Sequence, residues 1–203
     1  MAEVVLFHSV LGIRQGVIDA ATRMEAEGHT VHVPNLYDHG VVFDDYDPAS
    51  AHVESIGSYQ ELMRRTLERV HDLPADVVYA GFSNGGGSAE YLAVTRPGAR
   101  GALLFAAANS LKWFAAPGAA PPSWPPNAPV QVHYTVADPF RQQDELEAFA
   151  GEVRVSGAEF TLYEYGGHGH LFTDETLPRE YDGAATVLLW QRVLAFLHGV
   201  DNT

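Results

Sequence analysis

A serine flanked by glycines stands where an apolar segment gives way to a helical one. Gly81, Ser83 and Gly85 follow residues 76–82, which predict a strand, and precede residues 84–94, which predict a helix. A G-x-S-x-G sequence in this setting is typical of a nucleophilic serine, because a sharp strand-to-helix turn projects the serine Oγ beyond the sheet. We therefore predict that Ser83 is a catalytic nucleophile.

The alternative for this segment is a glycine-rich turn that binds a phosphate or binds nothing. A Walker phosphate loop is excluded, because the Lys followed by Ser or Thr is missing. A dinucleotide-binding turn would need G-x-G-x-x-G after the first strand, and residues 8–12 do not contain it. A helix that starts after the serine would instead aim the N–H of Asn84 at an oxyanion.

A serine hydroxyl is a weak nucleophile unless a base takes its proton and a carboxylate orients that base. When the serine occupies this kind of turn, an acid and then a histidine follow it along the chain. Asp138 comes just after a predicted strand at 130–136. His168 and His170 come just after another at 160–165, in a glycine-rich stretch. We predict that Asp138 and one of these two histidines complete a triad with the serine.

Each partner also has an alternative role. Asp138 precedes a proline and could instead cap the helix that follows. The two neighbouring histidines, with Asp174 and Glu175 nearby, suggest a metal site, but no third ligand has convincing spacing. We therefore expect no metal and no cofactor. His133 within a strand and His198 at the end of the last helix are expected to serve packing or the surface.

A second oxyanion donor is expected from the loop after the first strand, where the N–H of Val10 is the candidate. Ser9 would lie beside the nucleophile and contact substrate, or else cap the helix that begins near Ile13. Large aromatic side chains are candidate pocket walls, although each could equally belong to core or lid packing. They are Tyr37, Phe82, Trp113, Phe114, Trp124 and Phe172.

Strands and helices alternate along the chain, which predicts an α/β fold with a mostly parallel sheet covered on both faces. The predicted strands are 4–7, 29–33, 76–82, 102–106, 130–136 and 160–165. The predicted helices are 13–27, 56–73, 84–94, 143–153 and 184–197. Two segments interrupt the alternation, an acidic loop at 35–51 and a proline-rich loop at 112–129.

Composition limits the possible functions. The 203 residues suit one domain, 1–203, with its own core. The chain has 12 basic and 26 acidic residues and a net charge of −14, which disfavours nucleic-acid and membrane-surface binding. It has no cysteine, and we find no signal peptide at the N-terminus. We expect a cytoplasmic protein that is a monomer or a homodimer and acts on a small molecule.

With these residues placed, nearly the whole chain resembles the dienelactone hydrolase family of the α/β-hydrolase fold. The stretches that carry the resemblance are 7–12 (FHSVLG), 28–37 (GHTVHVPNLY), 81–86 (GFSNGG) and 169–172 (GHLF). The resemblance implies a compact fold of about six parallel strands in the order 2-1-3-4-5-6. Its G-H-x-F sequence selects His170 over His168 as the base.

The departures from the family concern the substrate. Family members that hydrolyse dienelactone use a cysteine where this chain has Ser83, and a glutamate where it has Ser9. They carry an arginine for the lactone carboxylate where this chain has Asp174. The resemblance therefore implies a serine hydrolase of a small ester or lactone, and a poor fit for an anionic diene lactone. A thioesterase, a peptidase and a non-catalytic binding protein on the same scaffold are the alternatives.

Overall fold

The structure, a computed structural model, describes residues 1–38 and 40–201. Within these residues, parallel strands form one six-stranded sheet in the order β2-β1-β3-β4-β5-β6. The strands are β1 Glu3–Phe7, β2 Thr30–His32, β3 Val78–Phe82, β4 Gly101–Phe105, β5 Val130–Thr135 and β6 Phe160–Tyr165. The predicted fold class and strand order are confirmed.

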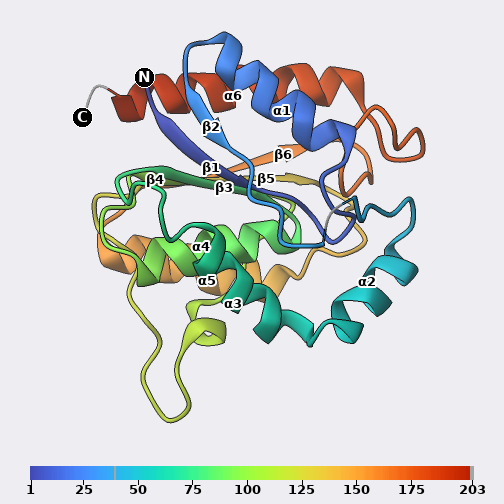
Figure 1. The fold of residues 1–203 in the computed structure, drawn as a ribbon. Coiled ribbons are helices and arrows are strands. Elements are labelled where there is room, and N and C mark those ends of the chain that lie inside the picture. The colour runs from blue at the N-terminus through green and yellow to red at the C-terminus, as the bar shows by residue number, and fades with distance from the viewer. Residues whose placement is uncertain (39, 202–203) are drawn as a thin grey trace.

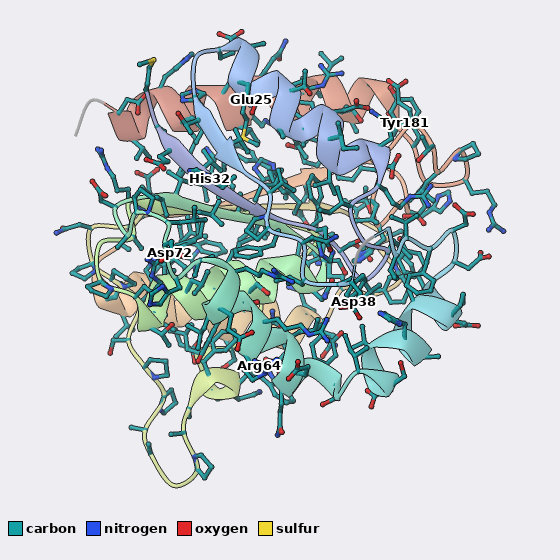
Figure 2. The ribbon with its side chains drawn as sticks, in the orientation of Figure 1. Glu25, His32, Asp38, Arg64, Asp72 and Tyr181 are labelled. Atoms are coloured by element: carbon teal, nitrogen blue, oxygen red, sulfur yellow. The ribbon has the colours of Figure 1, made fainter. Side chains whose placement is uncertain are left out.

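Helices cover both faces of the sheet (Figure 1). One face carries α1 Gln15–Ala26 and α6 Gly183–Asp201, and the other carries α3 Ser58–Arg69, α4 Asn84–Thr95 and α5 Gln143–Ser156. The remaining helix, α2 Tyr46–Ser55, lies to one side, beyond the carboxyl ends of the strands. Side chains fill the space between the layers, while charged side chains such as that of Arg64 on α3 lie at the outer surface (Figure 2).

The core is continuous along the central strands. Every residue of β3 and β4 is buried, as expected for parallel strands covered on both faces. The helix α6 is long and apolar enough to span a membrane by length and composition, but it packs Leu189, Trp190 and Val193 into the core. The Trp190 ring lies 6.1 Å from the ring of Phe105 on β4.

The region before β3 differs from the prediction. The acidic loop predicted at 35–51 ends in α2, and the helix predicted at 56–73 is shortened to α3 because Gly57, with φ of +115°, separates the two helices. Two large apolar side chains of α3, those of Tyr59 and Leu67, are exposed, since α3 buries little of its surface. The proline-rich loop begins with a short 3₁₀ helix, η1 Leu111–Phe114.

Candidate active site

The serine turn is tight and strained. β3 ends at Phe82 and α4 begins at Asn84, which leaves Ser83 alone between them with φ of 54° and ψ of −124°. A positive φ is unfavourable for a residue with a Cβ, and such strain is typical of functional sites. A Cβ on Gly81 would lie 2.1 Å from the carbonyl oxygen of Gly85, so the turn has no space for a side chain there.

The structure brings Ser83, His170 and Asp138 together in hydrogen-bonding order. His170 Nε2 lies 2.8 Å from Ser83 Oγ, and His170 Nδ1 lies 2.9 and 2.8 Å from the two carboxylate oxygens of Asp138. Asp138 and His170 are both buried. Asp138 also accepts the N–H of Phe140 at 2.8 Å, in a local turn, and it is not the cap of α5, which begins at Gln143.

The other histidines stand outside this arrangement. His168 is exposed, two residues before the buried His170. His133 is fully buried in β5, where its Nδ1 lies 2.9 Å from the hydroxyl of Tyr165. Burial lowers the pKa of His133 to about 3, so it is neutral at neutral pH. In the part of the chain that the structure describes, no three His, Asp or Glu side chains are grouped as metal ligands.

The two backbone N–H groups predicted to stabilise an oxyanion make no hydrogen bond in the described part of the chain. Within residues 1–38 and 40–201, the N–H groups of Val10 and Asn84 have no protein acceptor. Asn84 opens α4, so its N–H lies at the positive end of that helix. The side-chain Oδ1 of Asn84 is also buried without a partner in the described structure. The backbone N–H groups of Val10 and Asn84 are therefore available to donate to an oxyanion.

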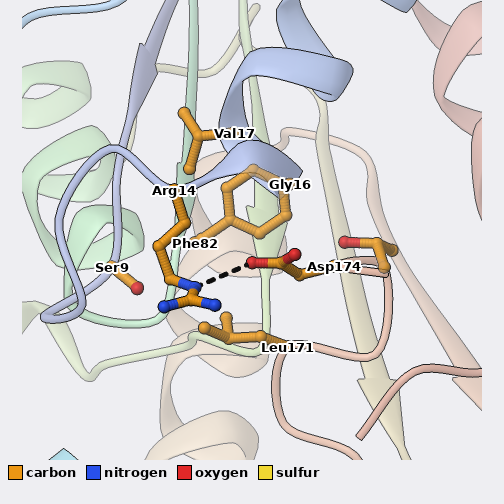
Figure 3. Close-up of a pocket in the computed structure, with 8 residues that line it drawn as sticks. Ser9, Arg14, Gly16, Val17, Phe82, Leu171 and Asp174 are labelled. Atoms are coloured by element: carbon orange, nitrogen blue, oxygen red, sulfur yellow. Dashed lines mark hydrogen bonds and ion pairs between the residues drawn. The ribbon is translucent and has the colours of Figure 1, made fainter. Parts of the chain in front are cut away.

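Two of the predicted substrate contacts, Ser9 and Phe82, line a small cavity together with Arg14, Leu171 and Asp174 (Figure 3). Its volume is about 10 Å³, which is room for about one water molecule.

The Ser9 hydroxyl accepts the N–H of Leu11 at 3.1 Å and so stabilises the turn after β1. The alternative role of Ser9 as a helix cap is wrong, because Arg14 precedes α1 and no side chain caps that helix.

The remaining predicted pocket walls are buried or displaced. Tyr37, Phe172 and Trp124 are buried, with 1%, 3% and 1% of their surface exposed, and none of them lines the small cavity. Trp124 packs edge-on against Phe149 of α5, and its indole N–H donates to Ala128 O just before β5. Trp113 is exposed, and its indole N–H donates to Glu145 of α5 at 2.9 Å. Phe114 lies 5.8 Å from the ring of Tyr91 on α4. Several of these aromatic side chains pack in the core. The sequence alone does not distinguish an aromatic residue of the core from one that lines a pocket.

Arg14 is a residue that the sequence did not reveal. Its Nε donates to Asp174 at 3.1 Å, and its other nitrogens donate to Phe43 O, Asp44 Oδ1 and the hydroxyl of Thr176. The guanidinium therefore joins three segments, and the dashed pair in Figure 3 is one of these contacts. Asp174, at the position of the family's arginine, is buried and paired.

Two aromatic rings flank the histidine. The Phe140 ring lies 4.7 Å from that of His170, and the Tyr46 ring lies 5.8 Å from it. Phe140 is 49% exposed, and the two aromatic rings lie 4.9 Å apart. The Tyr46 hydroxyl donates to Glu180, which also accepts the N–H of Leu171 at 2.7 Å. Burial and this carboxylate raise the pKa of the Tyr46 hydroxyl, which stays protonated.

The parallel sheet and the serine on a strand-to-helix turn, opposite a histidine held by a carboxylate, define the class of α/β-hydrolases. Residues 1–200 match the sequence model of the Dienelactone hydrolase family, and the chain therefore belongs to that family. Comparison with curated proteins gives no match.

Solved structures share the fold at low sequence identity. A dienelactone hydrolase-like promiscuous phosphotriesterase from metagenomic libraries superposes with a TM-score of 0.80 at 20% identity, covering 98% of this chain and 87% of that one. A putative dienelactone hydrolase from Klebsiella pneumoniae gives 0.71 at 21% identity, with 98% and 87% covered. Thermogutta terrifontis esterase 2, phosphorylated by paraoxon, gives 0.62 at 16% identity, with 98% and 82% covered.

Proposed function

We propose that this chain is a serine hydrolase that cleaves an ester or lactone bond of a small molecule. The observation that carries the proposal is the 2.8 Å contact between Ser83 Oγ and His170 Nε2, with Asp138 bonded to the opposite nitrogen of the ring. In this arrangement His170 takes the Ser83 proton while Oγ attacks the carbonyl carbon. The negative charge that develops on the carbonyl oxygen is stabilised by the N–H groups of Val10 and Asn84.

The second half of the reaction returns the chain to its starting state. The C–O bond breaks, His170 gives its proton to the leaving oxygen, and the acyl group remains on Ser83 as an ester. Water then attacks this ester with His170 as the base, which releases the acid and restores the serine hydroxyl. Asp138 keeps the ring in the tautomer that this cycle needs and stabilises the imidazolium.

The surroundings of the histidine favour an apolar leaving group. Because His170 delivers a proton to the leaving oxygen, the alcohol part of the substrate must lie beside its ring. The half-exposed Phe140 ring and the Tyr46 ring lie on that histidine and offer an apolar surface. We therefore expect esters of aromatic or apolar alcohols to be better substrates than esters of small polar ones.

The names of the structural neighbours support this class of reaction. One neighbour is called an esterase and carries a phosphoryl group from paraoxon, and another is called a phosphotriesterase. An organophosphate is therefore a suitable probe for a serine of this geometry. A thioester or a peptide would engage the same three side chains, and a non-catalytic binding protein would keep the fold without turnover.

The deciding experiment combines a substrate panel with active-site labelling. We expect burst release of p-nitrophenol from p-nitrophenyl acetate, labelling of Ser83 alone by a fluorophosphonate, and loss of both in Ser83→Ala. The panel compares acyl esters, lactones, thioesters and peptides at equal acyl size. Turnover that survives in Ser83→Ala, or a folded protein that reacts with no member of the panel, would show that the proposal is wrong.

A further inference from the structure

A buried histidine next to the site has a fixed protonation state. His8 is fully buried, and its two ring nitrogens contact backbone groups of opposite kinds. Its Nε2 accepts the N–H of Leu36 at 3.0 Å, so this nitrogen carries no proton. Its Nδ1 lies 2.7 Å from the carbonyl oxygen of Ser9, which can only accept, so Nδ1 carries the proton. Burial lowers the pKa of His8 to about 4, which keeps the ring neutral.

The carbonyl that His8 holds belongs to a rigid unit. In a trans peptide the Ser9 C=O and the Val10 N–H lie in one plane and point in opposite directions. Fixing the Ser9 oxygen therefore aims the Val10 N–H. Gly12 also donates its N–H to the Ser9 oxygen, at 3.0 Å, so two donors hold this plane.

The next peptide plane is held as well. The hydroxyl of Tyr37 donates to the carbonyl oxygen of Val10 at 2.8 Å, and the ring of Tyr37 packs edge-on against that of His8 at 4.9 Å. The N–H of Leu11 donates to the Ser9 hydroxyl. Of the N–H groups of residues 10–12, the described contacts leave only that of Val10 unused.

We propose that His8 is a positioning residue of the oxyanion hole, whose neutral ring fixes the Ser9–Val10 peptide so that the Val10 N–H faces the reacting carbonyl. Tyr37 supports the same residue from its other side. The inference rests on the proposed hydrolase function and extends it to two side chains that do not touch substrate. Because the oxyanion forms only after substrate has bound, in the transition state and the tetrahedral intermediate, loosening this plane lowers kcat and leaves KM nearly unchanged.

Two substitutions at the same position separate this role from simple packing. In His8→Asn the amide nitrogen replaces Nδ1 and keeps the donor to Ser9, while the acceptor for Leu36 is lost. In His8→Gln the amide oxygen replaces Nε2 and keeps that acceptor, while the donor to Ser9 is lost. Each variant thus loses one hydrogen bond of the same buried ring. We expect His8→Gln to lose kcat by about 10- to 100-fold, and His8→Asn to recover most of that loss.

A matched control and a spectroscopic reading complete the test. His29 is a buried histidine before β2, whose Nδ1 accepts the N–H of Ala2 at 3.0 Å, and His29→Gln should change the melting temperature without changing kcat. Nitrogen-15 spectra of the His8 ring should show a protonated Nδ1 and an unprotonated Nε2 at pH 7. Tyr37→Phe should also lower kcat at unchanged KM.

The outcomes are distinguishable. Equal kcat in His8→Gln and His8→Asn, measured where both are folded by their melting curves, would overturn the role of His8. A change confined to KM, or a protonated Nε2 in the spectra, would overturn it as well. Activity that persists in Ser83→Ala would instead show that the proposed hydrolase function itself fails.

Discussion

His168 and His170 are close in sequence and differ in their surroundings. His170 is buried against Asp138 and Ser83, whereas His168 is exposed. We expect His170→Ala to lower kcat/KM by at least about 10³-fold, because the serine loses its base. His168→Ala should retain most of the activity. Steady-state kinetics on p-nitrophenyl acetate check the pair, and equal losses would contradict the assignment of the base.

The burial of Glu90 makes the free energy of unfolding depend on pH. Glu90 of α4 is fully buried and accepts the backbone and side-chain N–H groups of Asn109 at 2.8 and 2.6 Å. Burial, with smaller contributions from Glu152 and Glu145, raises the pKa of Glu90 from 4.5 to about 8. Below pH 4.5 the folded and unfolded states are both protonated. As pH rises from 4.5 to about 8 the unfolded state releases its proton first, so the free energy of unfolding falls.

Glu90→Gln removes this titration. The Asn109 amide can rotate to accept from the new amide, so both hydrogen bonds survive. We expect the melting temperature of the variant, relative to that of the original chain, to be higher at pH 9 than at pH 5. Glu159→Gln, at an exposed position, is the matched control and should show no such trend. A difference that is the same at both pH values would mean that Glu90 is not protonated in the fold.

At the residue scale, the sequence predicted the triad because each member stands at a strand end with its own local signal. Ser83 has glycines on both sides, Asp138 follows β5, and His170 lies in a glycine-rich loop. Arg14 and Tyr46 have no such signal, because their partners are 29 or more residues away along the chain. Contacts of that kind depend on the folded arrangement of loops.

At the scale of elements, the Arg14 guanidinium holds together the start of α1, the segment at 43–44 and the loop at 174–176. Arg14→Met would leave the buried carboxylate of Asp174 unpaired, at a cost of about 3–5 kcal/mol in the free energy of unfolding. Adding Asp174→Asn should recover part of this loss, because the unpaired charge is removed. Urea denaturation of the two single variants and the double variant measures the coupling. Additive losses would show that the two side chains act independently.

The elements themselves were predicted to different degrees. β3 and β4 are continuous apolar runs bounded by turns, so their positions follow from the sequence. The helix α2 was missed because its ten residues bury little, with only Ala49 and Val53 fully covered, and its periodicity is correspondingly weak. The missed helix is also the one that brings Tyr46 to His170.

At the scale of the whole molecule, charge bears on the choice of substrate. The net charge is −14, and Arg14, the arginine that lines the small cavity, already donates to protein acceptors. We expect a neutral lactone to have a higher kcat/KM than its carboxylated analogue at low salt, and the gap to narrow as salt screens the surface. Paired kinetics at low and high ionic strength test this. Preference for the carboxylated lactone at low salt would mean that Arg14 leaves its partners to bind substrate.

The strand order, too, belongs to this scale. Alternating strands and helices predict parallel strands with covered faces, but local pattern does not order the strands. The order 2-1-3-4-5-6 came from the resemblance to a family, and the sheet confirms it. The loop after η1 projects from the molecule (Figure 1). Its shape could not be predicted from the sequence, because loop shape depends on packing that the local pattern does not encode.

The crowding around the serine turn divides its glycines into two groups for protein engineering. A Cβ on Gly85 would lie 2.4 Å from the carbonyl oxygen of His8, and one on Gly86 would lie 2.2 Å from the Cβ of Ala107, so saturation mutagenesis should return only glycine at both. Gly87 differs, because the nearest atom to its Cβ would be Asn109 Nδ2, at an ordinary 3.6 Å. It lies inside α4, so Gly87→Ala should raise the free energy of unfolding by about 1 kcal/mol. A stabilising substitution is therefore available at Gly87, only four residues from the proposed nucleophile.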